Sequence, residues 1–347
     1  MKPKISVVIP CYNVEDYIDR CVNSLVNQTI GLENLELIFI NDASIDSTLA
    51  KLLEFEKKYP DNIMVIDLPE NLRQGGARNV GIKYSSADYI GFVDSDDWVE
   101  LNMYEKLYSK IKEYNCNAVA CKEIVDYPDG RSIGNANGRD VFVTSETAIK
   151  DKEISWFYDF GVGVVNTLYE KSIIVDNEIY FPEKLTYEDN YWTRIIRLYI
   201  KSFYRIEENL YHYCMNKNST IHLFNSPHHL DRLDIELMKL NTYKEMGIFD
   251  TYRNEIELEF LDLYYVNTLH IIFTRFEPVP FNILSHIVET VLRLFPNFKN
   301  NPYFIKEPDK YNKFLNCIEM NLNEEEWKVI ADSYRNAVNI HSSLGNQ

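Results

Sequence analysis

The sequence predicts an α/β protein in which a mostly parallel sheet is followed by a C-terminal α-helical region. Over about the first 125 residues, short apolar runs rich in β-branched residues alternate with amphipathic stretches of helical spacing. Strands that alternate with helices in this way form parallel sheets covered by helices on both faces. Beyond Phe224 only long helical patterns remain, so we expect a domain boundary at residue 222/223.

The expected elements follow from the periodicity in chain order. Strands are predicted at residues 5–9, 35–40, 63–68, 88–93 and 118–121, with helices between them at 16–27, 47–59, 74–84 and 102–114. Residues 126–187 are less regular, with a turn at 127–130 and a short helix near 171–176. Helical spacing returns at 188–200, 227–246, 251–276, 281–295 and 323–342. Asn323, followed by three glutamates, is the expected N-cap of the last helix.

Composition argues against several classes of function. The chain has 347 residues, and its 36 basic and 53 acidic side chains give a formal net charge of −17. A field of this sign disfavours general nucleic-acid binding and binding to anionic lipid through overall charge. No apolar run reaches the roughly 18 residues that a membrane span needs, and the N-terminus is predicted to be a strand rather than a signal peptide. The six cysteines include no C-x-x-C pair, so we expect a reduced, cytoplasmic protein without a disulfide framework or zinc site.

Chemistry is expected just after the strands, because ligands bind at the carboxyl ends of parallel strands. Three carboxylates, Asp94, Asp96 and Asp97, follow the fourth predicted strand. They repel one another unless a cation lies between them, and their oxygen atoms suit Mg²⁺ or Mn²⁺. We therefore predict a divalent metal site here. The alternative is a solvated acidic loop in which Asp96 or Asp97 caps a helix.

The first two strands end in less specific signals. Pro10-Cys11-Tyr12-Asn13 contains no glycine, so backbone cradling of a pyrophosphate is not expected at this turn. The tyrosine ring is either packed or lines a base or ribose pocket. Asp42, after the second strand, could accept the imino proton of a pyrimidine or a ribose hydroxyl, but an aspartate that caps the next helix is the commoner case.

The segment NLRQGGARNVG places two arginines at a predicted helix start. Arg73 and Arg78 are candidates to pair with phosphate, since guanidinium groups match its oxygens. The alternative is that one of them pairs with the surrounding acids, and we favour that interpretation for Arg73. Gly75 and Gly76 permit a tight turn or a close backbone approach.

Histidine placement limits the choice of a catalytic base. All seven histidines lie after residue 211, so a base in the first part of the chain must be another side chain. Adjacent Glu188 and Asp189 are the natural candidates. The alternative is that these acids only stabilise the helix start through their interaction with the helix dipole. Further along the chain lies a loop rich in hydrogen-bond donors, with Lys217, Ser219, Thr220 and His222. It could close over a diphosphate or serve as a linker. The histidine would reach a metal only if this loop folds back.

Taken in order, the segments VVIPCYN, INDASIDST, NLRQGGARNVGI, YIGFVDSDDW and TYEDN resemble glycosyltransferase family 2. The resemblance covers about residues 4–222. It implies the GT-A fold, with a Rossmann-like nucleotide-binding sheet, and an inverting sugar transfer from a nucleotide sugar. Residues 1–222 would then be the catalytic domain, with the nucleotide-sugar half at about 1–125 and the acceptor half at about 126–222. Residues 223–347 match no motif of the family.

The resemblance also implies roles for single residues. Asp189 would be the general base, with Glu188 in support. Asp94-Ser95-Asp96 matches the D-x-D motif, with Asp96 as the main metal ligand and Asp94 directed toward ribose or metal. The other donor-binding positions would be Pro10, Tyr12, Asn13, Asp42 (a contact to the base, typically uracil), Asn71, Arg78, Ser95, Lys217, Ser219 and Thr220.

The expected reaction is transfer of a hexosyl or N-acetylhexosaminyl group from a UDP-sugar, with Mn²⁺ or Mg²⁺, to an acceptor hydroxyl in surface glycan, glycolipid or glycoprotein synthesis. A lipid-linked acceptor would bring the enzyme into peripheral contact with the inner face of the membrane, and the C-terminal helices could support a homo-oligomer. Two alternatives are a non-catalytic nucleotide-sugar-binding partner subunit and a sugar-phosphate nucleotidyltransferase. The intact acid pairs argue against the first and the missing Gly-rich loop against the second.

Overall fold

The computed structural model describes residues 2–144, 163–216, 223–306 and 315–344. The chain divides into two compact units, Met1–Lys217 and Asn218–Gln347, and each is described here by itself. The predicted boundary at 222/223 lies at the edge of the undescribed segment 217–222, as do the predicted loop residues Lys217, Ser219, Thr220 and His222, which are outside the described residues.

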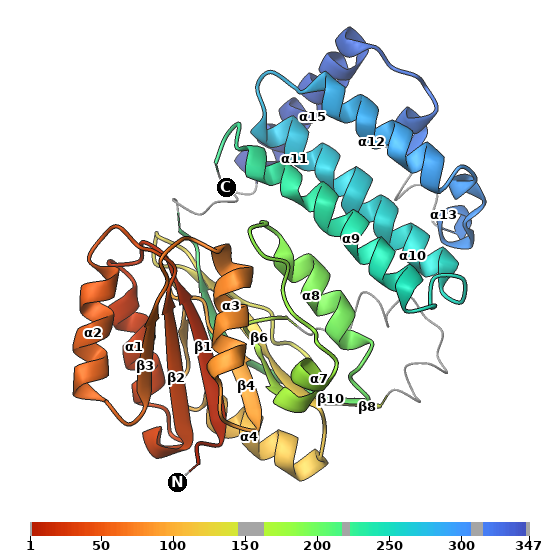
Figure 1. The fold of residues 1–347 in the computed structure, drawn as a ribbon. Helices are drawn as coiled ribbons and strands as arrows, with labels where there is room; N and C mark the ends of the chain where they lie inside the picture. Colours follow the sequence, from red (N-terminus) through yellow and green to blue (C-terminus); the bar gives the residue numbers. More distant parts are fainter. Residues whose placement is uncertain (1, 145–162, 217–222, 307–314, 345–347) are drawn as a thin grey trace. The chain divides into compact units, whose positions relative to one another are not determined.

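A ten-stranded mixed sheet forms the centre of the first unit (Figure 1). Its order is β3-β2-β1-β4-β9-β6-β10-β5, with β7 paired to β6 and β8 to β10. The strands are β1 (Ile5–Cys11), β2 (Leu35–Asn41), β3 (Ile63–Asp67), β4 (Tyr89–Phe92), β5 (Trp98–Val99), β6 (Ala118–Asp126), β7 (Ser132–Gly134), β8 (Val141–Thr144), β9 (Thr167–Glu170) and β10 (Ser202–Cys214). The predicted α/β fold is confirmed, and β1–β4 pair in parallel as expected.

The second half of the sheet differs from the prediction. Strand β9 lies antiparallel between β4 and β6, so the fifth predicted strand does not continue the parallel set directly. The 13-residue strand β10 pairs in parallel with β6 and antiparallel with β5 and β8. These pairings join segments that are distant in the sequence, and periodicity carries no signal for them.

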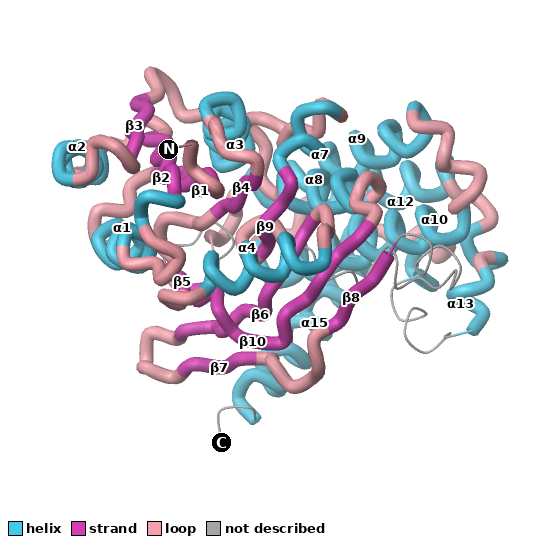
Figure 2. The backbone as a smooth tube through the Cα atoms, turned by 90° about the horizontal axis from the view of Figure 1, so that it is seen from below, coloured by secondary structure: helices cyan, strands magenta, loops and turns pink. Residues whose placement is uncertain are grey.

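Helices cover both faces of the sheet (Figure 2). They are α1 (Ile18–Val26), α2 (Thr48–Lys58), α3 (Arg73–Tyr84), α4 (Met103–Tyr114), α7 (Lys171–Asp176) and α8 (Glu188–Arg197). The alternation of side chains along β1 decides which face meets which helix. Ile5, Val7 and Ile9 join the core formed with α1 and α4, whereas Val8 faces α3, where a Cβ added at Gly81 would come within 2.2 Å of it.

An aromatic cluster fixes α8 to the sheet. The Trp192 ring is stacked on Phe181 with ring centroids 4.5 Å apart, and it meets Phe92 and Tyr169 edge-on. Its indole N–H donates to the carbonyl of Ile179 at 3.1 Å. Trp192 is fully buried, so the first turn of α8, which carries Glu188 and Asp189, is held in place by packing.

The second unit is helical, as predicted. Its helices are η3 (Pro227–Leu230), α9 (Asp231–Glu245), α10 (Arg253–Phe260), η4 (Leu261–Val266), α11 (Asn267–Arg275), α12 (Phe281–Leu294), η5 (Phe298–Asn300), α13 (Pro302–Lys306), η6 (Asn316–Ile318) and α15 (Glu324–Leu344). Asn323 caps α15 as predicted, because its side chain accepts from the Glu326 N–H and Glu326 accepts in return from the Asn323 N–H. Within the described ranges, none of the helices is long and apolar enough to cross a membrane.

Candidate active site

Arg78 is the centre of the acidic cluster at the carboxyl ends of β1 and β4. Its Nη2 donates to Asp94 Oδ1 at 2.7 Å, and its Nη1 donates to Glu188 Oε1 at 2.6 Å. The guanidinium also lies 5.3 Å from the centroid of the Phe181 ring. Although burial opposes the charge, the two carboxylates raise the pKa of Arg78 above its ordinary value, so the guanidinium stays charged.

This geometry shows which groups hold the Arg78 side chain. Its side chain is only 3% exposed, and both terminal nitrogens are held by carboxylates. Arg78 therefore joins the acids of the site, and its expected place beside the donor stays a prediction. Arg73, for which pairing with acids was the favoured interpretation, lies partly exposed at the start of α3, where it donates to Thr186 Oγ1 at 3.0 Å.

Gly75 permits the approach of α3 to α8. A Cβ at this position would lie 2.3 Å from the carbonyl oxygen of Pro182 and 3.1 Å from Cγ of Glu188. Any side chain here would push the two elements apart and lengthen the Arg78–Glu188 ion pair. The close backbone approach expected at Gly75 and Gly76 therefore occurs at Gly75, against Pro182 and Glu188.

The three aspartates after β4 have different surroundings. Asp97 is 1% exposed, and its carboxylate accepts from the Cys214 N–H at 2.7 Å and from the Tyr211 hydroxyl at 2.6 Å. It anchors the loop to β10 and does not cap a helix. Burial, with repulsion from Asp94 and Asp96, raises the pKa of Asp97 to about 9. Asp94 and Asp96 remain partly exposed.

Asp94 and Asp96 fit a divalent cation chemically. Burial and the neighbouring Asp94 charge raise the pKa of Asp96 to about 6, which is the electrostatic conflict that a bound cation would relieve. Both offer carboxylate oxygens, the ligands that Mg²⁺ and Mn²⁺ prefer. Among the described residues, no three histidine, cysteine or acidic side chains are grouped so as to enclose a metal, so the rest of the coordination shell would come from substrate and water.

Glu188 and Asp189 occupy the first turn of α8 but differ in exposure. Glu188 is buried in the ion pair with Arg78, whereas Asp189 is exposed. Displacement of solvent by the surrounding protein raises the pKa of Asp189, and Arg78 opposes this shift. Burial raises the pKa of Glu188 to about 7 against the opposing charge of Arg78. Of the pair, Asp189 is the more exposed carboxylate.

The loops after β1 and β2 lie together. The Asn13 N–H donates to Ser44 Oγ at 3.0 Å, and Asn13 Oδ1 accepts from the Ile45 N–H at 2.9 Å. Tyr12 is 49% exposed beside them, so its ring is available to a ligand and is not packed. Pro10 is buried within β1 opposite Ile40, and therefore supports this loop from inside the sheet.

Asp42, Asn71 and Ser95 are bonded within the protein. Asp42 is 2% exposed, and its carboxylate accepts from the Leu72 N–H at 2.6 Å. Asn71 donates to the Asp42 carbonyl and accepts from the Arg73 N–H. Asp42 thus fixes the segment that leads into α3, and its contact with a base stays a prediction. Ser95 is buried, and it opposes the rise that burial causes in the pKa of the Cys11 thiol.

Tyr211 and His212 belong to the site and carry no sequence signal for it. The Tyr211 hydroxyl accepts from the Asp94 N–H at 3.2 Å while it donates to Asp97, so one buried tyrosine fixes the D-x-D loop. His212 stacks on Trp98 with ring centroids 3.4 Å apart, and its Nδ1 lies 3.0 Å from Asp126 Oδ2. Only the pairing of β10 with β5 and β6 brings these residues to the loop.

Comparison with known proteins decides the family. The model named Glycosyl transferase family 2 matches residues 6–165. The uncharacterized glycosyltransferase YibD of Escherichia coli is 30% identical over 281 residues, which cover 74% of this chain and 77% of YibD. This chain belongs to glycosyltransferase family 2.

Two further proteins resemble this family 2 glycosyltransferase, one in sequence and one in fold. The poly(ribitol-phosphate) beta-glucosyltransferase of Bacillus spizizenii is 34% identical over 201 residues, which are 57% of this chain but 30% of that protein. In fold, the chain is similar to residues 1–349 of Staphylococcus aureus TarS in complex with UDP-GlcNAc, with a TM-score of 0.57 and 20% identity over 96% of this chain and 92% of that one.

Proposed function

We propose that this family 2 glycosyltransferase transfers a sugar from a UDP-sugar to a hydroxyl of a cell-surface polymer, with inversion and with a divalent metal ion. The bridge of Arg78 is the observation that supports this most strongly. One guanidinium binds Asp94 of the D-x-D motif and Glu188, the neighbour of Asp189, at 2.7 and 2.6 Å. The acids expected on the donor side and on the acceptor side therefore share one site.

In this proposal Asp96 and Asp94 hold the metal ion. Bound there, Mn²⁺ or Mg²⁺ would neutralise the charge that develops on the diphosphate. Exposed Tyr12 and the adjoining Asn13–Ser44 turn form the surface available to the nucleoside at the carboxyl end of β1.

Asp189 is proposed as the general base. It takes the proton of the acceptor hydroxyl while the acceptor oxygen attacks the anomeric carbon, and the bond from that carbon to the diphosphate oxygen breaks. Attack from the face opposite the leaving group inverts the anomeric configuration. Glu188 remains in the ion pair with Arg78 and keeps the first turn of α8 in position, which makes it a positioning residue.

The proposed substrates draw on the relatives. TarS, which shares the fold, was solved with UDP-GlcNAc, and the Bacillus spizizenii relative is named for transfer of glucose to poly(ribitol phosphate). We propose a UDP-hexose or UDP-N-acetylhexosamine as donor and a polyol-phosphate or polysaccharide chain as acceptor.

The Asp189→Asn variant tests this mechanism. It keeps the shape of the side chain and removes its proton affinity, so we expect sugar transfer to fall by roughly 10²-fold or more, with UDP binding in Mn²⁺ unchanged by calorimetry. Asp61→Asn, an exposed aspartate in the loop before β3, is the matched control and should transfer at the wild-type rate. Near-wild-type transfer by Asp189→Asn, retention of configuration in the product by NMR, or nucleotide-sugar binding without turnover in the wild type would contradict the proposal.

A further inference from the structure

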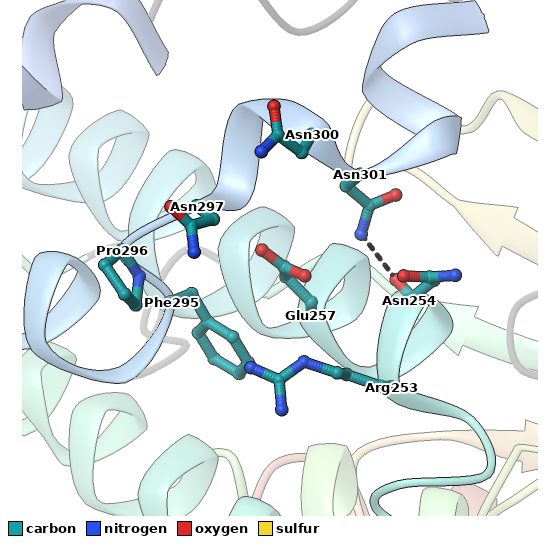
Figure 3. A pocket seen from close by; sticks show the side chains of 8 residues that line it. All are labelled: Arg253, Asn254, Glu257, Phe295, Pro296, Asn297, Asn300 and Asn301. Carbon is teal, nitrogen blue, oxygen red and sulfur yellow. Dashed lines mark hydrogen bonds between the residues drawn. The ribbon is translucent and has the colours of Figure 1, made fainter.

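A second polar pocket lies within the Asn218–Gln347 unit, among residues to which no role has been given. Its volume is about 190 Å³. It is formed by the first turns of α10 and by the segment that connects α12 to α13, whose sequence Pro296–Pro302 reads PNFKNNP. Figure 3 shows the side chains of Glu257 and Asn297 directed toward one another across it, with the Arg253 guanidinium beside the Phe295 ring.

The pocket has a buried floor and an exposed polar rim. Phe295 is 1% exposed and Glu257 7% exposed, and together they form the floor. The rim carries exposed polar side chains, namely Arg253, Asn254, Asn297 and Asn300. A buried carboxylate under exposed amides and one guanidinium is an unusual grouping for a surface whose only task is solvation.

Glu257 has acceptor capacity left for a ligand. A carboxylate offers about four acceptor sites, and the neighbouring Asn301 amide donates to the Asn254 carbonyl at 2.8 Å. Burial raises the pKa of Glu257, while Asn301 and Arg253 lower it. Arg253 itself lies 5.3 Å from the centroid of the Phe249 ring, which holds its guanidinium at the rim.

We propose that this pocket binds a neutral polyhydroxyl unit, a single monosaccharide or polyol residue. Amides donate and accept at once, and a carboxylate accepts two hydroxyls, so the rim and floor match adjacent hydroxyl groups, which also donate and accept. One arginine and one glutamate balance each other in charge, which disfavours a strongly anionic or cationic ligand. The volume lies below the roughly 300–1,000 Å³ typical of drug-sized ligands, which suits one such unit.

In the proposed reaction, this pocket would be a second binding site for the acceptor. A unit of a polymer chain bound here would raise the local concentration of the acceptor without touching the reacting atoms. This use rests on the proposed function, whereas binding itself does not, so the two can fail separately.

The test measures binding on the full chain without donor. Ribitol and the methyl β-glycosides of glucose and N-acetylglucosamine, each at millimolar concentration, are titrated while saturation-transfer NMR is recorded. The Asn297→Ala/Asn300→Ala double variant removes two exposed rim amides. Asn282→Ala, which changes an exposed asparagine on α12 outside the pocket, is the matched control. Asp189→Asn tests whether a probe binds at the active site instead of the pocket.

We expect at least one probe to bind the wild type, the Asn282→Ala control and the Asp189→Asn variant equally. The double variant should bind it at least about tenfold more weakly, the effect of one or two hydrogen bonds, and Glu257→Gln should also weaken it. Binding that the double variant leaves unchanged, binding of Ca²⁺ alone with no response to any probe, or no binding of any probe would overturn the proposal. Absence of sugar transfer by the wild type, with pocket binding intact, would instead contradict only the proposed function.

Discussion

Arg78 joins three features that the sequence presents separately: the D-x-D loop after β4, the Gly-rich start of α3 and the acidic start of α8. Its ion pair with Glu188 is buried and its ion pair with Asp94 is partly buried, so removal of the arginine would leave both carboxylates without their counter-charge. The side chain thereby sets the distance between the two acid pairs. A sequence can identify an arginine near a site but cannot identify its partners, which lie 16 and 110 positions away.

Replacement of Arg78 should damage both stability and activity. We expect Arg78→Met to lower the free energy of unfolding by about 3–5 kcal/mol and to abolish measurable transfer. The double variant Arg78→Met/Glu188→Gln removes one of the stranded charges and should recover part of the stability but none of the activity. Denaturant unfolding and the transfer assay check both.

Arg131→Met is the control for this experiment, because Arg131 forms an ion pair with Asp129 that is exposed on both sides. Its loss should cost no more than about 1 kcal/mol. If Arg78→Met were as stable and active as this control, the bridge would have no structural or catalytic importance.

Helices and strands with strong periodicity were the most predictable part of the chain. The short helix expected near 171–176 is α7, Lys171–Asp176, and the Asn323 cap forms as expected. Strand β9 was not predicted because its four residues, Thr167–Glu170, are too few to show an alternating pattern in the sequence. The site was predictable where a single motif carries it, as at Asp94–Asp97, and not where it depends on contacts across the sheet, as for Tyr211 and Asp97.

The packing of α3 on β1 depends on the absence of a side chain at Gly81. A Cβ there would lie 2.2 Å from Val8 Cγ1, so we expect Gly81→Ala to destabilise the protein by about 1–3 kcal/mol. Val8→Ala opens space for the new methyl group, and the pair of changes should therefore show favourable coupling in a double-mutant cycle measured by denaturant unfolding. Strict additivity of the two effects would mean that the helix and strand do not meet at this point.

Over the whole molecule, the cysteines behave as core residues. All six are free and buried, and burial raises the pKa of every one of their thiols, to about 11 for Cys116 and about 12 for Cys214. Since the thiolate is the reactive form, a higher pKa lowers the reactive fraction at any pH below it.

We therefore expect the native protein to react slowly with a chromogenic disulfide reagent at pH 8 and all six thiols to react quickly in denaturant. The absorbance of the thiolate released from the reagent gives the number of reactive thiols in the native and in the denatured protein. A thiol that reacts at once in the native protein would show that part of this core is open to solvent.

Metal-dependent transfer at the shared acidic site is tested most directly by one rate measurement. UDP release from UDP-GlcNAc and UDP-glucose, with poly(ribitol phosphate) as acceptor, is followed for the wild type, Asp96→Ala and the control Asp61→Ala, in Mn²⁺ and in excess EDTA. We expect the wild type and the control to lose at least about 10²-fold of their rate in EDTA, since a metal contributes several kcal/mol to such a transition state. Asp96→Ala should be inactive under both conditions with an unchanged circular dichroism spectrum. Full activity of Asp96→Ala, or a wild-type rate that EDTA leaves unchanged, would contradict the assignment of Asp94 and Asp96 to the metal and the mechanism built on it.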